Sequence, residues 1–219
     1  MTKKILMVLT SADQMGDDKP TGTWLSEFAD AYLEFQKQGY DVTISSIKGG
    51  KAPVDPGSID ENTPQEILDA EKYLADTVSI EEVEMGNYDV IFLPGGHGTM
   101  FDFPENKKLQ SLLREFTEAD KYVVSVCHGP AGLVGPTLSN GEPLVKGKRV
   151  SAFTDAEERD TTFDSLMPFL LESKLRELGA TVETAPNWSE KSVVDGKLIT
   201  GQNPQSTPLV VKELIKQLG

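Results

Sequence analysis

The chain of 219 residues has a single cysteine, two histidines and few basic residues. One cysteine cannot form a disulfide within the chain, which fits a reducing compartment. The 21 lysines and arginines are outnumbered by 35 aspartates and glutamates, so the formal net charge is −14. A phosphate backbone would be repelled unless the basic residues clustered, and the sequence has no such cluster. We therefore expect no nucleic-acid partner.

Long hydrophobic runs are also missing. No apolar stretch approaches the roughly 20 residues that span a bilayer, and the apolar stretch 5–9 is too short for the core of a signal peptide. We predict a cytoplasmic protein with no membrane partner. The sequence has no linker, low-complexity tract or internal repeat, which favours one domain over residues 1–219.

The chain does contain a regular alternation of strand and helix patterns. Short apolar runs typical of strands lie at 3–10, 40–47, 88–93, 122–126 and 147–153. Helical spacing of apolar residues lies at 25–37, 64–77, 106–119, 163–178 and 209–218. Three short strands are expected at 181–184, 192–194 and 197–200, the last two as a hairpin. This rhythm predicts an α/β fold with a mostly parallel sheet, helices on both faces, and ligands beyond the carboxyl ends of the strands.

The cysteine lies within residues 121–133, KYVVSVCHGPAGL. A β-branched run ends at Cys127, and His128-Gly129-Pro130 breaks the strand before a small-residue helix start. The pattern predicts a nucleophile elbow with cysteine in place of serine. At such a turn, backbone N–H groups and the positive end of the helix would favour thiolate. A lone cysteine is otherwise most often a small core residue, but this context favours the nucleophile.

Several polar residues near the predicted strand ends are open to two interpretations. Glu27 could be a solvated charge at a helix start, and the acidic run 155–158 a solvated surface. His128 could act chemically or only fill space. We expect the two tryptophans to pack rather than to contact substrate.

Five segments carry a resemblance to a known family: TGTWLSEFADAYLEF, PGGHGTMFDFP, VSVCHGPAGL, VSAFTDAEE and LITGQNPQST. In order and spacing they resemble the ThiJ/PfpI superfamily of the class I glutamine-amidotransferase-like fold, and within it the glyoxalase III and heat-shock-31-like branch. The likeness extends over nearly the whole chain. It implies a flavodoxin-like three-layer sandwich with a cysteine nucleophile elbow, often assembled as a homodimer.

The resemblance also implies roles for particular residues. Cys127 would be the nucleophile with His128 beside it, Glu27 would lie next to the sulfur, and Glu158 would be the acidic partner of the histidine. The loop after strand 88–93 would face the substrate and supply oxyanion donors: Gly95, Gly96 and His97, together with the backbone N–H of His128. From the residues alone, His97 is interpreted as shaping the pocket or the dimer edge rather than performing chemistry.

The implied activity is that of a glutathione-independent glyoxalase III, which converts methylglyoxal or a related 2-oxoaldehyde to D-lactate or another 2-hydroxy acid. Cys127 would form a hemithioacetal, and Glu27, with a raised pKa, would be protonated, donate to the thiolate and later move a proton from C1 to C2. We expect no cofactor, and no metal because two histidines are too few for the extra metal site of larger relatives. Two alternatives stay open: a protein or nucleotide deglycase, and a stress chaperone or redox sensor that uses oxidation of Cys127. A peptidase or an amidotransferase is a weaker interpretation.

Overall fold

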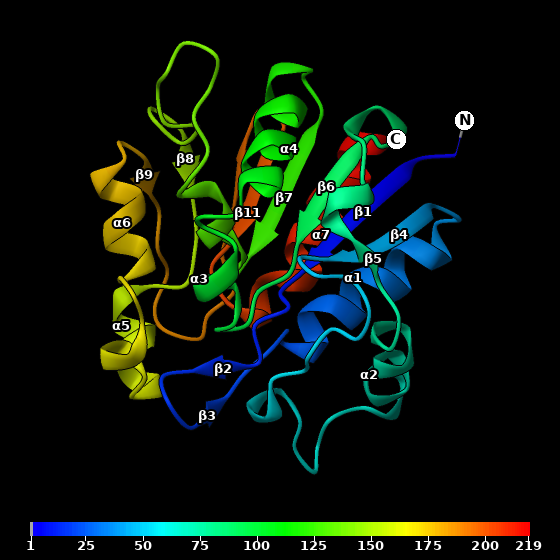
Figure 1. Cartoon of the computed structure of the whole chain (residues 1–219), viewed down its shortest axis with the longest axis vertical. Coiled ribbons are helices and arrows are strands. Elements are labelled where there is room, and N and C mark those ends of the chain that lie inside the picture. Colours follow the sequence, from blue (N-terminus) through cyan, green and yellow to red (C-terminus); the bar gives the residue numbers. More distant parts are fainter. Residues whose placement is uncertain (1) are drawn as a thin grey trace.

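The computed structural model describes residues 2–219, and its centre is a seven-stranded sheet (Figure 1). In spatial order the strands are β10 (Ser192–Asp195), β11 (Leu198–Gly201), β7 (Tyr122–Val126), β6 (Val90–Leu93), β1 (Lys4–Leu9), β4 (Asp41–Ser46) and β5 (Val78–Ser79). All neighbouring pairs are parallel except β10 and β11, which form the predicted hairpin. The predicted mostly parallel sheet is therefore confirmed.

The sheet is buried on both faces, which explains why β1 has an unbroken apolar sequence. Leu6 and Val8 pack into a cluster with α4 (Lys107–Glu118), whereas Ile5 and Met7 pack into a second cluster on the opposite face. That second cluster contains side chains of α1 (Leu25–Lys37), α2 (Gln65–Ala70) and α7 (Thr207–Leu218). Helices thus cover both faces, as expected for the three-layer sandwich (Figure 1).

Smaller elements lie outside the central sheet. They are β2 (Gln14–Met15), β3 (Lys19–Pro20), α3 (Thr99–Asp102), β8 (Arg149–Val150), α5 (Asp155–Thr161), α6 (Leu171–Glu177) and β9 (Thr181–Val182). The predicted strand 147–153 is only the two-residue β8, and it pairs with β9 rather than with the central sheet. The predicted helix 163–178 is interrupted around Pro168, so a 3₁₀ turn at Asp164–Leu166 precedes α6.

Three strands end at the same edge of the sheet, and the candidate residues follow them. The loop 94–98 follows β6, Cys127 follows β7, and residues 202–206 follow β11. This agrees with the expected ligand position beyond the carboxyl ends of parallel strands. Within residues 2–219 no helix is long and apolar enough to cross a membrane. A single domain over 1–219 stays a prediction.

Candidate active site

Cys127 occupies a strained turn directly after β7. Its φ is 60°, a conformation that a residue with a side chain adopts only when the surroundings hold it there. Cys127 N–H donates to the carbonyl of Gly201 at 3.0 Å, and Phe153 N–H donates to the carbonyl of Cys127 at 2.9 Å. The chain continues as a 3₁₀ turn over Gly129–Leu133, not as an α-helix. The elbow is present, with a shorter helical start than predicted.

The expectation that this turn favours a thiolate is wrong for the substrate-free site. Cys127 is only 2% exposed, and burial raises the pKa of its thiol well above the ordinary value. An ionised Glu27 would raise that pKa further, whereas the N–H of His128 lowers it more weakly. A five-residue 3₁₀ turn does not offset the loss of hydration. The resting sulfur is a neutral thiol.

Glu27 projects from the first turn of α1 and is completely buried. Burial raises the pKa of its carboxyl to about 8, even though hydrogen bonds with Cys127 and Gly95 oppose the rise. Oε2 accepts the N–H of Gly95 at 2.5 Å, and Oε1 has no hydrogen-bond partner among residues 2–219. The Cys127 side chain lies close enough to affect the pKa of the carboxyl. Glu27 is therefore protonated at neutral pH, as predicted, beside a thiol rather than a thiolate.

His128 lies between the sulfur and a buried carboxylate. Its Nδ1 is 3.4 Å from Cys127 Sγ, and its Nε2 is 2.6 Å from Glu158 Oε2. Burial lowers the pKa of His128 and outweighs the opposing effect of Glu158, so the ring is neutral. A carboxylate can only accept, so the single ring proton is on Nε2. The unprotonated Nδ1 then faces the sulfur and can take its proton.

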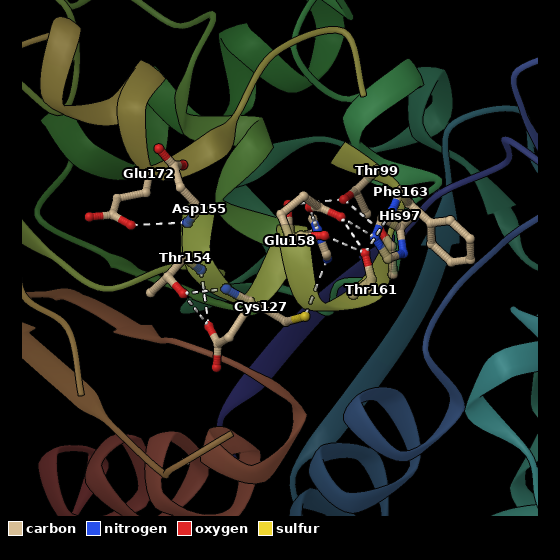
Figure 2. A network of polar contacts seen from close by, with 12 residues as sticks. His97, Thr99, Cys127, Thr154, Asp155, Glu158, Thr161, Phe163 and Glu172 are labelled. Carbon is tan, nitrogen blue, oxygen red and sulfur yellow. Dashed lines mark hydrogen bonds and ion pairs between the residues drawn. The ribbon is translucent and has the colours of Figure 1, made fainter. Parts of the chain in front are cut away.

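Glu158 binds a second histidine as well. His97 Nε2 is 2.7 Å from Glu158 Oε1, although the two residues are 61 positions apart (Figure 2). Burial alone would raise the pKa of Glu158, but the hydrogen bonds from the rings of His128 and His97 hold it well below its usual range. The sequence placed His97 among the oxyanion donors, whereas the structure pairs its ring with Glu158.

Helix α5 positions this carboxylate through a capping box. Thr154 Oγ1 accepts the N–H of Glu157, and the carboxylate of Glu157 accepts the N–H of Thr154, both at 3.0 Å. Glu157 is fully buried and its Oε1 accepts three further hydrogen bonds, from Trp188 N, Gln202 Nε2 and Asn203 Nδ2. The interpretation of 155–158 as a solvated run is wrong for these buried acids. Sequence reasoning missed α5, although threonine followed by glutamate three residues later is a helix-start signature.

The glycine-rich loop supplies backbone rather than side chains. The N–H of Gly95 is used by Glu27, so Gly95 is not free to serve as the expected oxyanion donor. Gly96 has a φ of 109°, and a Cβ there would lie 2.1 Å from the carbonyl oxygen of Gly22. Its own N–H has no backbone acceptor within the described part of the chain, 2–219. The N–H groups of His97 and Gly98 have no acceptor among these residues either, so Gly96 is one of three candidate donors in this loop.

A cavity of about 330 Å³ opens onto these groups. Cys127, His97 and His128 line it, together with Trp24, Phe153 and Trp188. Trp188 is 40% exposed and packs edge to face on Phe153 while lining the cavity, so the expectation that it packs rather than contacts substrate stays a prediction. Although Cys127 is nearly inaccessible from bulk water, its sulfur is in contact with a space that can hold a small molecule.

Two histidines and a carboxylate could also hold a metal ion. The donor atoms of His97, His128 and Glu158 lie within 4.8 Å of one another, and two histidines with one glutamate is a known zinc ligand set. Counting histidines in the sequence therefore did not exclude a metal. The carboxylate already accepts from both rings, so an ion would have to replace these hydrogen bonds. The absence of a metal stays a prediction.

Comparisons with known proteins agree with the architecture and the motifs. Residues 20–217 match the DJ-1/PfpI family. The chain is 32% identical to the glutathione-independent glyoxalase HSP31 of Saccharomyces cerevisiae over 221 residues, 93% of each sequence. It superimposes on glyoxalase III of Candida albicans with a TM-score of 0.86 and 29% identity, covering 98% of this chain and 96% of the other. With the Rapid Encystment Protein 24 KDa of Francisella tularensis the TM-score is 0.95 and the identity 34%, over the whole of both chains. This chain belongs to the DJ-1/PfpI family, the ThiJ/PfpI superfamily that its five segments resemble.

Proposed function

We propose that the protein is a glutathione-independent glyoxalase that converts methylglyoxal, or a related 2-oxoaldehyde, and water to D-lactate or another 2-hydroxy acid. One arrangement carries the proposal: a cavity-lining thiol with a neutral imidazole nitrogen 3.4 Å away and the buried, protonated carboxyl of Glu27 beside it. The names of the relatives from S. cerevisiae and C. albicans support the same activity.

Addition to the aldehyde comes first. Sγ of Cys127 bonds to the aldehyde carbon C1 while the thiol proton passes to Nδ1 of His128. The imidazolium so formed is stabilised by Glu158, and it returns the proton to the C1 oxygen, which gives a neutral hemithioacetal. The N–H of Gly96 can stabilise the charge that develops on this oxygen. No thiolate is needed in the resting enzyme.

Glu27 then moves a proton from C1 to C2. Its O–H donates to the C2 carbonyl oxygen while its carboxylate takes the C1 proton, which gives an enediol bonded to sulfur. The carboxyl next gives that proton to carbon C2 and takes the proton of the C1 hydroxyl, which leaves a thioester. Glu27 is protonated before and after both exchanges. A pKa of about 8, close to working pH, suits an acid that must also act as a base.

Water completes the reaction. It attacks C1 of the thioester, His128 Nδ1 takes a water proton, and that proton goes to the departing sulfur of Cys127. The product is lactate, and the balance is one 2-oxoaldehyde and one water for one 2-hydroxy acid. C1 is oxidised and C2 is reduced within the same molecule, so neither an external oxidant or reductant nor glutathione enters this sequence.

The alternatives use the same thiol differently. A deglycase would act on hemithioacetals and aminocarbinols instead of on the free aldehyde. A redox sensor depends on an accessible thiolate, and the burial and raised pKa of Cys127 argue against it. We therefore favour the glyoxalase.

The test is the formation of lactate from methylglyoxal in a buffer without glutathione. We expect lactate from the wild type and none above background from Cys127→Ala. Purified glycation adducts, corrected for their spontaneous reversal, form the parallel assay. Lactate formation that survives in Cys127→Ala would refute the proposal, and faster turnover of adducts than of free methylglyoxal would favour the deglycase.

We also propose a homodimer located in the cytoplasm that needs no cofactor. Support for the location is the single cysteine, which cannot form a disulfide within the chain. Light scattering of the purified protein would measure the oligomeric state, and cell fractionation would measure the location.

A further inference from the structure

The cavity above Cys127 is larger and more apolar than methylglyoxal requires. Its volume of about 330 Å³ equals that of about ten water molecules at ~30 Å³ each. Methylglyoxal, with five non-hydrogen atoms, would fill only part of it. No lysine or arginine is among the lining residues, so no cation is available to bind a carboxylate or phosphate group. Both tryptophans of the chain line the cavity.

Trp188 is held in place although it is an exposed aromatic residue. Its φ is 63°, which is unfavourable for a residue with a bulky side chain. The backbone N–H donates to Glu157 at 2.9 Å, and the indole N–H donates to Asp160 at 3.3 Å. Both acceptors belong to α5, the helix that also carries Glu158. Helix α5 therefore fixes Trp188 in the wall of the cavity and also carries Glu158, the partner of His128.

The indole ring also belongs to an aromatic series that reaches the catalytic histidine. The rings of Trp188 and Phe153 meet edge to face with centroids 5.6 Å apart, and Phe153 lies against His128 with centroids 4.2 Å apart. Such rings offer a preformed apolar surface for a planar apolar group, and aromatic contacts stabilise such a group beyond the burial of its area.

We infer that the cavity formed by Trp24, Phe153 and Trp188 selects 2-oxoaldehydes that carry an aromatic or large apolar group on C2, in preference to methylglyoxal. The inference rests on the proposed glyoxalase function and specifies its substrate class. With C1 bonded to sulfur, the group on C2 extends into the cavity, where these rings can cover it. The chemistry is unchanged: phenylglyoxal and water give mandelate, as methylglyoxal and water give lactate.

The test compares kcat/KM for phenylglyoxal and methylglyoxal in the wild type and in three variants. Trp188→Gly removes the ring and accepts the positive φ without strain, and Trp188→Phe restores an aromatic ring. Tyr73→Ala is the matched control, since Tyr73 is 37% exposed and does not line the cavity. For each variant we take the ratio of kcat/KM for phenylglyoxal to kcat/KM for methylglyoxal. Comparing this ratio between variants cancels the difference in intrinsic reactivity of the two aldehydes.

We expect the ratio of kcat/KM for phenylglyoxal to that for methylglyoxal to fall about tenfold in Trp188→Gly. We expect it to recover largely in Trp188→Phe and to stay within about twofold of wild type in Tyr73→Ala. A ratio unchanged in Trp188→Gly, or shifted equally by Tyr73→Ala, would overturn the inference. If methylglyoxal is still turned over through Cys127 in that case, only the inference fails; if the wild type acts on neither aldehyde, the proposed function fails.

A second measurement needs only the wild-type protein. Acetophenone and acetone carry the same two groups next to a ketone but have no aldehyde to react. We expect acetophenone to inhibit methylglyoxal turnover competitively at a concentration at least about tenfold lower than acetone does. Equal inhibition constants, or inhibition that does not compete with methylglyoxal, would contradict an aromatic subsite in this cavity.

Discussion

Replacing Glu27 by glutamine should make the protein more stable and at the same time inactive. Burial raises the pKa of this carboxyl from 4.5 to about 8. Between these values the folded protein keeps a proton that the unfolded chain has lost, so folding becomes less favourable as the pH rises. The cost is about 1.4 kcal/mol per pH unit, or about 3 kcal/mol at pH 7 and about 5 kcal/mol above pH 8.

Glutamine has nearly the same shape and cannot ionise. Its carbonyl oxygen can accept the N–H of Gly95, and its NH₂ group can donate to the sulfur of Cys127, so both contacts of Glu27 are kept. The free energy of unfolding of Glu27→Gln minus that of wild type should therefore be flat below pH 4.5. It should rise between pH 4.5 and 8 and be constant above. A gain of about 3 kcal/mol at pH 7 corresponds to a Tm increase of roughly 6–12 °C.

The assay is urea unfolding of both proteins from pH 4 to 9, combined with lactate formation from methylglyoxal. Loss of the proton carrier should lower kcat by ~10² to 10⁴. A stability difference that does not depend on pH would refute the raised pKa, and retained turnover would refute the catalytic role. The raised pKa of Glu27 and its catalytic role are thus tested by separate measurements.

Three further outcomes are expected. Alkylation of Cys127 by iodoacetamide should be slower than that of a small free thiol at neutral pH and should remain slower at pH 9, because burial raises its pKa well above the ordinary value; a rate equal to that of the free thiol at pH 9 would contradict this. Gly95→Ala should lower kcat/KM by at least about 100-fold, because the added Cβ would lie 2.8 Å from Glu27 Oε2 and 2.7 Å from His128 N. A near-normal kcat/KM would contradict this steric argument. Glu158→Gln should lower kcat by ~10². It should also lose less stability than wild type on acidification below pH 4.5, because the depressed pKa of Glu158 stabilises the wild-type fold above that pH. An acid unfolding curve identical to that of wild type would argue against the ionised carboxylate.

Local sequence patterns predicted the framework of this fold well. Apolar residues at helical spacing, followed by Gly39, predicted a helix at 25–37, and α1 has these bounds. The elbow after β7 was also predictable, since a β-branched run that meets cysteine, histidine and glycine leaves few alternatives. Patterns of this kind act within a few residues and need no knowledge of distant contacts.

The electrostatics of the site could not be predicted in the same way. Whether Cys127 is a thiol or a thiolate depends on how deeply the folded chain buries it, and the local turn suggested the wrong answer. The contact between His97 and Glu158 joins positions 61 residues apart, and nothing in either local sequence indicates the other. Glu157 differs in this respect, because its capping-box spacing from Thr154 is visible in the sequence.

The most direct test of the mechanism is a crystal structure of Glu27→Gln after soaking with methylglyoxal. This variant keeps the thiol of Cys127 and the Nδ1 of His128 but lacks the group that carries the reaction past the hemithioacetal. We expect continuous density from Sγ to C1 of a tetrahedral adduct, with its hydroxyl near the N–H of Gly96. An unmodified sulfur in crystals that contain methylglyoxal elsewhere in the cavity would contradict covalent catalysis by Cys127.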